Sequence, residues 1–466
     1  MLASLPLPQP KGAQKEVVYL NSTGHTVVLG TAGSGKTTMA VLRARWLADE
    51  APSASGPTLL VTFNKALVTY LKQSHAAVGS RLTVETYHKF ARGYLSSRGQ
   101  MSYNCICNDP EWYISRAIAH VRHKGFTATV LDRPIKFFRD ELHWIAGHGM
   151  QSASAYARAD RIGRMRPLQS HDREAVFAVR NEYIEQRAHA GFRYDWDDLA
   201  TAVLQELAHD NSERRYKHII VDEGQDFTPQ MMRSLAAAIP SDGSLTFFGD
   251  YAQQMYGSRM SWKSIGLNVS APVEFRQNYR NSRQIARLAL AMSGMPHFKD
   301  DADLVVPQSP AADGPLPTVW KQRDEAAQLI AAAELALDRG SSQAVAVLTR
   351  NRIYEQRLCN LLKGGNPTRL HRDLNGWVTG PHIYYGTLHA AKGMEFDTVL
   401  ILYCDDGLMP DQDEIDAYGE ASALAREARL LYVGVTRARS ELVLLHSSNL
   451  SRLLPQEPTG LYQGVS

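Results

Sequence analysis

Gly30-Thr31-Ala32-Gly33-Ser34-Gly35-Lys36-Thr37-Thr38 is the stretch of sequence on which the interpretation of the whole chain depends. It has the pattern G-x-x-x-x-G-K-[ST] of a phosphate-binding loop. An apolar run at 26–29 precedes it and indicates a buried strand, and 39–42 indicates the start of a helix. The motif requires this context, because inward-pointing backbone N–H groups and the helix N-terminus together attract phosphate. The sequence therefore predicts binding of a nucleoside triphosphate with Mg²⁺, with Lys36 at the β- and γ-phosphates and Thr37 on the metal ion.

Short apolar runs recur along the chain, and a helical pattern follows each of them. Runs that are apolar on both faces suit a parallel sheet covered by helices, so they predict an α/β fold. The runs divide into two sets near residue 273, which favours a tandem pair of similar domains. Between about 91 and 194 the rhythm stops, and we expect a helical insertion there. The runs are 27–29, 59–63, 218–221, 245–248, 345–348, 399–402 and 442–445.

The composition is that of an ordinary globular protein. The chain has 466 residues, 44% of them hydrophobic and 21% charged, and its net charge of +3 is too small to indicate a partner. The cysteines at 105, 107, 359 and 404 lack paired metal-binding spacing, so we expect reduced thiols. No stretch approaches the roughly 20 apolar residues of a membrane span. The first ten residues, MLASLPLPQP, do not resemble a signal peptide, so we expect a cytoplasmic protein without a membrane partner.

A second anchor is His218-Ile219-Ile220-Val221-Asp222-Glu223-Gly224-Gln225-Asp226, a predicted strand that ends in acidic residues. Asp222 would hold Mg²⁺, and Glu223 would orient and deprotonate the attacking water. A solvated acidic turn is the alternative, but an acidic strand end in a chain with a phosphate-binding loop is far more specific.

With these two anchors in order, the sequence resembles superfamily 1 DNA helicases of the UvrD/Rep type. The resemblance continues through the asparagine-tyrosine-arginine signature at 278–280, a fifth motif at 387–397 and a sixth at 430–438. It implies ATP as the nucleotide, bound between two halves of the chain. The nucleotide contacts that the resemblance implies are Gln14 on the adenine edge, Tyr279 stacked on adenine, Glu395 facing the ribose, and Gln253, Arg280 and Arg437 at the γ-phosphate.

The resemblance also implies a nucleic-acid site and a domain organisation. Two tandem RecA-like P-loop domains are expected, the first made of 1–90 and 195–272 and the second of 273–466. The helical insertion at 91–194 would belong to the first. Single-stranded DNA, or a junction of single and double strands, is the implied partner. Its contacts would be Phe63, Asn64, His88, Tyr256, Arg259, Thr387 and His389.

Two departures from the family pattern change what is expected. Ser258 stands where the family has a stacking tryptophan. Only about 36 residues separate Arg350 from Thr387, so the large accessory domain that relatives carry there is expected to be missing or reduced to a loop near 363–381. We also expect no nuclease domain after the sixth motif. Translocation along DNA is therefore a safer prediction than strand separation.

Residues 111–166 combine ten Lys and Arg with five Asp and Glu, and seven aromatic residues lie among them. Basic charge and aromatic rings are typical of nucleic-acid contact. The alternative is the core and the solvated face of a small helical unit, and the sequence leaves both interpretations open.

The leading hypothesis is an ATP-dependent translocase or helicase on single-stranded DNA, with 3′→5′ polarity by family analogy. An alternative is a DNA-stimulated ATPase subunit that regulates a partner nuclease, as in the Gabija anti-phage system, which a compact chain of this type resembles in outline. A non-catalytic scaffold is disfavoured because Lys36, Asp222, Glu223, Arg280 and Arg437 are all intact. Gln225, Gln253 and the paired arginines disfavour a P-loop kinase or GTPase, because these residues fit a motor with two lobes.

Overall fold

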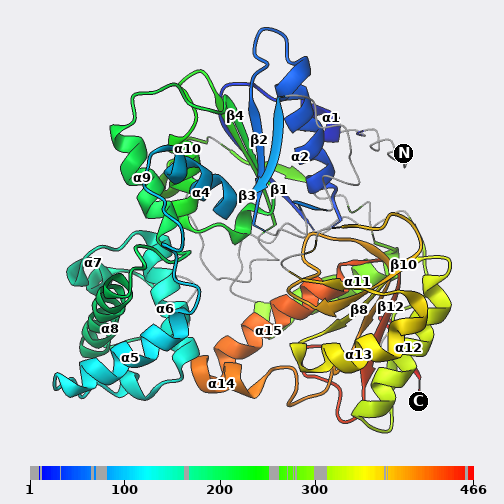
Figure 1. Ribbon diagram of the computed structural model, residues 1–466. Helices are drawn as coiled ribbons and strands as arrows, with labels where there is room; N and C mark the ends of the chain where they lie inside the picture. The colour runs from blue at the N-terminus through cyan, green and yellow to red at the C-terminus, as the bar shows by residue number, and fades with distance from the viewer. Residues whose placement is uncertain are drawn as a thin grey trace.

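The computed structural model contains two parallel-sheet domains and a separate helical unit (Figure 1). The first domain is at the top of Figure 1, the second at the lower right and the helical unit at the lower left. The structure describes residues 10, 13–31, 33–63, 68–69, 81–161, 167–250, 262–269, 271–275, 278, 281–298, 312–371, 374, 376–456 and 460–465.

The sheet of the first domain has six parallel strands, and the strand that leads into the phosphate-binding loop is near one edge. Alternate side chains of β1 enter different cores: Val28 packs with α1 and α2, whereas Val27 packs on the opposite face. Both faces are therefore buried, as the apolar runs predicted. In spatial order the strands are β3 (Leu82–Thr86), β2 (Thr58–Thr62), β4 (His218–Val221), β5 (Ser244–Gly249), β1 (Gly24–Gly30) and β6 (Val273–Phe275).

Two groups of helices cover this sheet. On one face lie α1 (Ala13–Val18) and α2 (Lys36–Arg45), and α2 continues as a π-helical turn at Trp46–Glu50. On the other lie α4 (Tyr87–Ser97), α9 (Leu199–His209) and α10 (Pro229–Ala237). The start of α10 follows a common rule: the Thr228 hydroxyl accepts a hydrogen bond from the Met231 N–H, and Pro229 occupies the first helical position.

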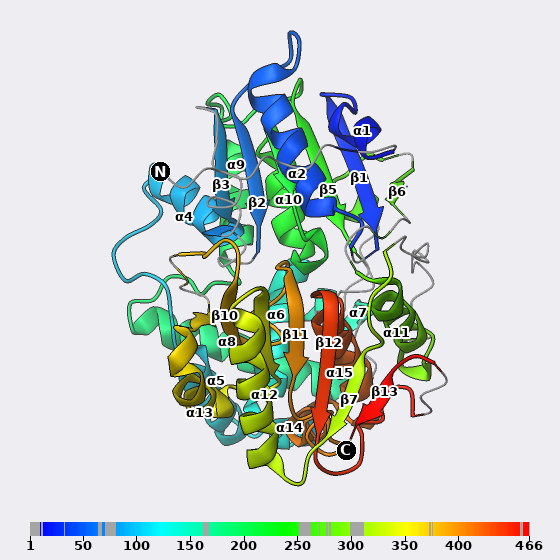
Figure 2. The ribbon, with the colours of Figure 1, turned by 90° about the vertical axis from the view of Figure 1, so that its right-hand side faces the viewer.

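The second domain contains a seven-stranded parallel sheet. Helices α12 (Glu325–Gly340) and α13 (Glu355–Leu362) cover one face, and α11 (Arg283–Ser293) and α15 (Glu420–Val435) cover the other (Figure 2). Its strands in spatial order are β13 (Gln463–Val465), β7 (Thr318–Lys321), β12 (Ala438–His446), β11 (Phe396–Ile401), β8 (Ala344–Thr349), β10 (His382–Thr387) and β9 (Thr368–Leu370). Two sheets of this kind are the tandem RecA-like architecture expected from the sequence.

The helical unit interrupts the first domain between α4 and α9. It consists of α5 (Pro110–His123), α6 (Ile135–His148), α7 (Ala153–Arg158) and α8 (Ser170–His189), packed around a core of their own. Strand β6 follows the domain border expected at 272/273, yet it pairs with β1 in the first sheet. In the second domain, α13 and β9 occupy the interval between Arg350 and Thr387.

Candidate functional site

The phosphate-binding loop forms a tight backbone turn between β1 and α2. Gly33 and Gly35 have φ angles of +78° and +85°, a region that strongly favours glycine. A Cβ on Gly30 would lie 2.6 Å from Ser34 Oγ, so the loop also has no room for a side chain there. The first residue of α2 is Lys36, so the lysine projects from the N-terminal end of a helix. Its Nζ donates to the carbonyls of Gly30 at 2.8 Å and Thr31 at 2.7 Å and lies 3.5 Å from Asp250 Oδ2.

Oxygen atoms around the loop fit Mg²⁺ and a phosphate group. Thr31 Oγ1, Ser34 Oγ and Asp222 Oδ2 are buried and have no hydrogen-bond partner in the described part of the chain. Thr37 hydrogen-bonds the Asp222 side chain and so lies beside it at the end of β4. Mg²⁺ prefers oxygen ligands, and one or two protein groups with phosphate oxygens and water complete such sites. The pair Thr37 and Asp222 is therefore suited to hold the metal ion of a bound nucleotide.

Glu223 occupies a strained position directly after this pair. Its backbone is left-handed, with φ 54° and ψ 41°, which is rare outside glycine and is found at functional sites. Gln225 fixes the side chain by donating from Nε2 to Glu223 Oε2 at 2.5 Å, and Gln225 Oε1 accepts from the Asp250 N–H at 3.0 Å. A Cβ on Gly224 would lie 2.2 Å from the Phe247 ring, so the turn depends on glycine.

Charges from both domains determine the ionisation of these carboxyl groups. Burial raises the pKa of Glu223, but Lys392, Arg437 and Lys36 outweigh burial and hold the pKa below its usual value. Burial and the neighbouring Glu223 raise the pKa of Asp222. Because Lys392 and Arg437 belong to the second domain, groups from both domains converge on Glu223.

One buried ion pair joins the two domains beside Glu223. Lys392 Nζ contacts Asp226 Oδ1, and the two side chains are only 4% and 6% exposed. Burial raises the pKa of Asp226 to about 6 although Lys392 lowers it. Neither residue was assigned a role from the sequence, although both lie inside motifs that the sequence revealed. The sequence did contain one signal for this pair, because a lysine and a carboxylate of opposite charge lie in motifs of different domains.

The remaining residues predicted to contact the nucleotide differ in their surroundings in the structure. Gln14 Nε2 donates to the Ser34 carbonyl at 3.1 Å, so this side chain lies against the loop. Glu395 Oε2 accepts two hydrogen bonds from Arg439, at 3.0 and 3.2 Å. Arg437 is 1% exposed and donates to the Val433 carbonyl at 3.0 Å. The predicted residues that lie outside the described part of the chain are Ala32, Asn64, Gln253, Tyr256, Arg259, Tyr279 and Arg280.

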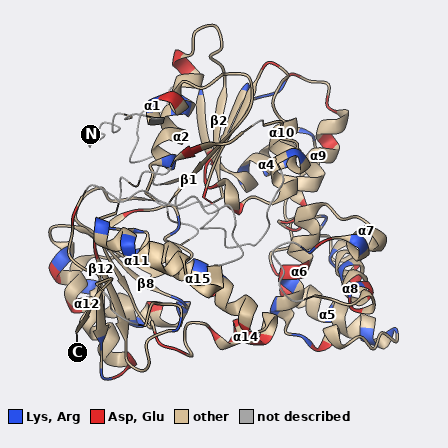
Figure 3. Ribbon diagram, turned by 180° about the vertical axis from the view of Figure 1, so that it is seen from behind, with Lys and Arg blue, Asp and Glu red and all other residues tan. Residues whose placement is uncertain are grey.

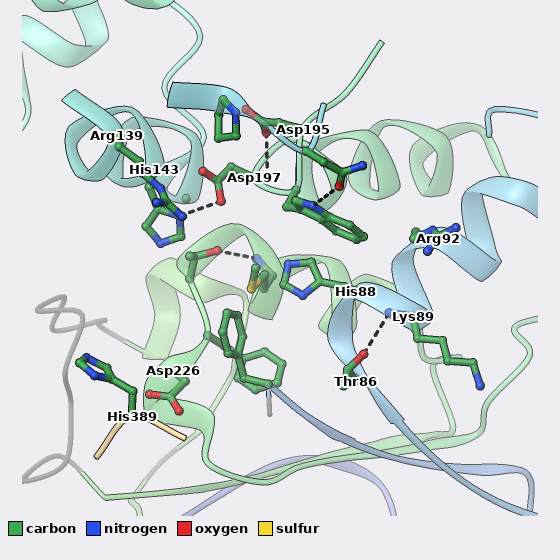
Figure 4. A pocket seen from close by; sticks show the side chains of 18 of the residues that line it. Thr86, His88, Lys89, Arg92, Arg139, His143, Asp195, Asp197, Asp226 and His389 are labelled. Carbon is green, nitrogen blue, oxygen red and sulfur yellow. Dashed lines mark hydrogen bonds and ion pairs between the residues drawn. The ribbon is translucent and has the colours of Figure 1, made fainter. Parts of the chain in front are cut away.

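A cavity of about 1500 Å³ lies between the first domain, the second domain and the helical unit. Figure 4 shows side chains from all three around it, among them His88 from the first domain, Arg139 and His143 from the helical unit and His389 from the second. The predicted DNA contacts Phe63, His88, Thr387 and His389 all line this cavity. The structure therefore brings together residues that are more than 300 positions apart in the sequence.

Aromatic rings form a connected row along one wall of the cavity. The Phe63 and His88 rings meet edge to face with centroids 5.4 Å apart, and His88 meets Trp196 at 5.3 Å. The guanidinium of Arg92 lies 5.8 Å from the Trp196 ring centre. The sequence reasoning missed Trp196, which lies where the chain returns from the helical unit to the first domain. Rings exposed in a cavity of this kind can stack on bases.

The described lining of the cavity is positively charged overall. Nine lysine and arginine residues face five aspartate and glutamate residues, an excess that suits a phosphodiester backbone. Desolvation, and then nearby cations such as Arg350 and Lys392, lower the pKa of His389. The basic residues are Lys89, Arg92, Lys136, Arg139, Arg215, Arg352, Arg369, Lys392 and Arg426.

The aromatic residues of the segment 111–166 mostly form a core. Phe137, Phe138, Trp144 and Tyr156 are at most 4% exposed. Of the two interpretations left open by the sequence, the core therefore accounts for these rings. Two basic residues of this segment, Lys136 and Arg139, line the cavity.

The helical unit also contacts the second domain directly, through helix α14 (Gln412–Tyr418) and the start of α15 (Figures 1 and 3). Lys136 Nζ lies 2.7 Å from Glu414 Oε1, and Arg426 lies 3.0 Å from Asp140. The Tyr418 hydroxyl donates to Asp140, and the Arg426 guanidinium lies over the Tyr418 ring. Of these residues, Lys136, Asp140 and Arg426 also line the cavity.

Two helicase family models match this chain. The UvrD/REP helicase N-terminal domain matches residues 11–273, and the UvrD-like helicase C-terminal domain matches 366–449. The ATP-dependent DNA helicase UvrD2 of Mycobacterium tuberculosis (strain ATCC 25618 / H37Rv) is 23% identical over 560 residues, which cover 95% of this chain and 79% of UvrD2. The alignment of 560 residues is longer than this chain of 466 residues, so it includes positions at which UvrD2 has a residue and this chain has a gap.

Two further matches are shorter. The putative ATP-dependent DNA helicase YjcD of Bacillus subtilis (strain 168) is 24% identical over 302 residues, 61% of this chain and 36% of YjcD. The solved C-terminal domain of a possible DNA helicase from Lactobacillus has a TM-score of 0.28 and 19% identity, and covers 40% of this chain and 99% of its own length. That score is too low to support an inference.

In the described residues, no helix is long and apolar enough to cross a membrane.

Proposed function

The chain belongs to the UvrD/REP helicase family, whose members hydrolyse ATP and act on DNA, and on this premise we propose that it is a translocase that moves 3′→5′ along single-stranded DNA. The strand would occupy the cavity between the two domains and the helical unit. Hydrolysis would take place at Glu223, where charged groups from both domains converge.

The observation that carries this proposal is the position of Lys392. Lys392 lines the cavity, three residues after His389, and its Nζ contacts Asp226, three residues after Glu223. A strand held by Thr387 and His389 would therefore act on the same short segment that positions Lys392 against the hydrolysis site. Such a connection is what a motor needs to couple its grip on DNA to the state of the nucleotide.

The roles of the site residues follow from their positions. Lys36 would leave its carbonyl partners and bind the β- and γ-phosphates, and Thr37 and Asp222 would hold Mg²⁺, which neutralises phosphate charge when bound. Glu223, held by Gln225, would orient and deprotonate the attacking water. Arg437, together with Arg280, would stabilise charge on the γ-phosphate from the second domain.

The domain division completes the proposal. The two RecA-like domains would be the moving parts, and the segment 91–194 would form one wall of the DNA path. The described residues between Arg350 and Thr387 pack within the second domain, where Leu374 joins the core and Trp377 packs against it. The proposal therefore places translocation before unwinding as the main activity.

Two measurements test the proposal. Steady-state ATP hydrolysis should rise strongly on addition of single-stranded DNA, and Lys36→Ala should abolish it. A streptavidin block should then be displaced faster from the 5′ end of a biotinylated strand than from the 3′ end. Strong stimulation without displacement of either block would instead favour a DNA-stimulated ATPase that regulates a partner nuclease, and displacement only from the 3′ end would reverse the polarity.

A further inference from the structure

Arg43 is a fully buried cation in α2 whose bonds lie outside the phosphate-binding loop. It is 0% exposed. Its guanidinium donates to four backbone carbonyls in or just after α1, and its Nε donates to Thr246 Oγ1 on β5 at 2.8 Å. The carbonyls are those of Val17 at 3.4 Å, Val18 at 3.2 Å, Leu20 at 3.0 Å and Asn21 at 2.7 Å.

Two of these carbonyls, those of Val17 and Val18, belong to the last residues of α1, and those of Leu20 and Asn21 belong to the residues just after it. The last carbonyls of a helix have no intrahelical donor, and a cation at that end interacts favourably with the helix dipole. Helix α1 has only six residues, too few to be stable alone in water. Burial lowers the pKa of Arg43 to about 10, so the guanidinium is still charged at neutral pH. Arg43 therefore acts as a C-terminal cap that joins α1 to α2 and β5.

The other end of α1 carries Gln14. This side chain is 8% exposed and donates to the Ser34 carbonyl, and a Cβ on Gly35 would lie 3.0 Å from its Nε2. Val17 is fully buried in the core that α1 shares with α2. Because α1 carries Gln14, the contact of Gln14 with the loop depends on how α1 is held. Arg43 of α2, seven positions after Lys36, holds α1 in place.

We propose that Arg43 is a positioning residue for nucleotide recognition: by capping α1, it holds Gln14 beside the phosphate-binding loop and so sets the KM for ATP and the preference for ATP over GTP. This inference rests on the proposed role of Gln14 at the adenine edge. Because Arg43 would not contact the nucleotide, we expect its substitution to change the KM for ATP and the preference for ATP. The turnover number at saturating ATP should be retained.

The test compares hydrolysis of ATP and GTP, at saturating single-stranded DNA, by the wild type, Arg43→Lys, Gln14→Ala and the double variant. Arg43→Lys keeps the charge but loses most of the donors. Since one hydrogen bond to a charged group corresponds to about tenfold in an equilibrium constant, we expect KM for ATP to rise about tenfold with kcat within about twofold. The preference for ATP should fall to that of Gln14→Ala, and the double variant should be no worse than Gln14→Ala alone. Arg45→Lys, two residues further along the helix and only half-buried, is the matched control.

The outcomes separate the inference from its premise. A lower melting temperature with unchanged KM and selectivity would show that Arg43 is only structural and would overturn the inference. If Gln14→Ala itself leaves KM and selectivity unchanged, the proposed role of Gln14 fails, and this inference fails with it. If Arg43→Lys does not fold, Thr246→Val removes one contact and keeps the guanidinium. It should raise KM in the same direction by a smaller factor, and an unchanged KM there would count against the inference.

Discussion

The buried pair between Lys392 and Asp226 makes a quantitative prediction about how the two domains are held together. The pKa of Asp226 is about 6, against a usual value of 3.8, so the native state binds this proton more tightly than the unfolded chain does. A shift of about two units corresponds to about 3 kcal/mol. The contribution of Asp226 to the free energy of unfolding should therefore fall as the pH rises from about 4 to about 6 and then level off.

Replacing Lys392 with methionine removes the cation that offsets the burial of Asp226. An opposite charge at this range is typically worth about 1–3 pKa units, so the pKa of Asp226 should rise by that amount. At pH 5 the carboxyl is mostly protonated in both proteins, and the substitution should cost little. At pH 8 it should cost about 1.4–4 kcal/mol more. This increment approaches the cost of about 3–5 kcal/mol for breaking a buried ion pair.

Calorimetry of the wild type, Lys392→Met and Lys392→Met/Asp226→Asn at pH 5 and pH 8 measures this difference. With roughly 2–4 °C per kcal/mol for a domain of 150–250 residues, Lys392→Met should lose several degrees at pH 8 and little at pH 5. The double variant should lose the part of the pH dependence that Asp226 contributes, so its loss should be similar at the two pH values. Lys363→Met, at an exposed position of the second domain, is the control. An equal loss at both pH values, or a double variant as sensitive to pH as Lys392→Met, would refute the reasoning.

The remaining predictions concern the two sites. Glu223→Gln should bind ATP but hydrolyse it at least about 100-fold more slowly, and turnover near the wild-type rate would exclude Glu223 as the base. Arg437→Ala should lower kcat by about 10³-fold with little change in ATP affinity, and unchanged turnover would remove it from the γ-phosphate. Trp196→Ala should weaken single-stranded DNA binding by about 1–3 kcal/mol in titrations, whereas Trp112→Ala, exposed on the helical unit, should not. Arg352→Ala should lower the slope of log affinity against log salt by about one, and Trp196→Ala should leave that slope unchanged; the opposite pattern would reassign the phosphate and base contacts.

Local pattern was sufficient to predict the elements whose residues interact mainly with their chain neighbours. All the apolar runs identified as strands correspond to strands of the structure: β1, β2, β4, β5, β8, β11 and β12. The helical insertion was expected for a similar reason, because the absence of apolar strand runs between about 91 and 194 is visible along the chain itself. Short edge strands such as β6 and β13 have only three residues each and are defined by their pairing partners, which no local window contains.

The phosphate-binding loop and the acidic strand end were predictable because their chemistry needs particular residues at short spacing. Trp196 and Lys392 were not, because each derives its importance from residues in other elements: Trp196 from His88, and Lys392 from Asp226. Likewise, composition could not decide whether Trp144 and Phe138 were core or surface. Burial is a property of the packed helices, not of the segment.

The sequence by itself determined the phosphate-binding loop motif, the family and the alternation of strands and helices, because each is encoded in residues close together along the chain. Only the tertiary structure decided which wall of the cavity each basic residue occupies, that the helical unit and the second domain meet through Lys136 and Glu414, and that Arg43 caps a helix more than 20 residues before it. Hydrogen bonds, ion pairs and burial act over a few ångströms in space whatever the separation in sequence. Their partners are therefore known only after the chain has folded.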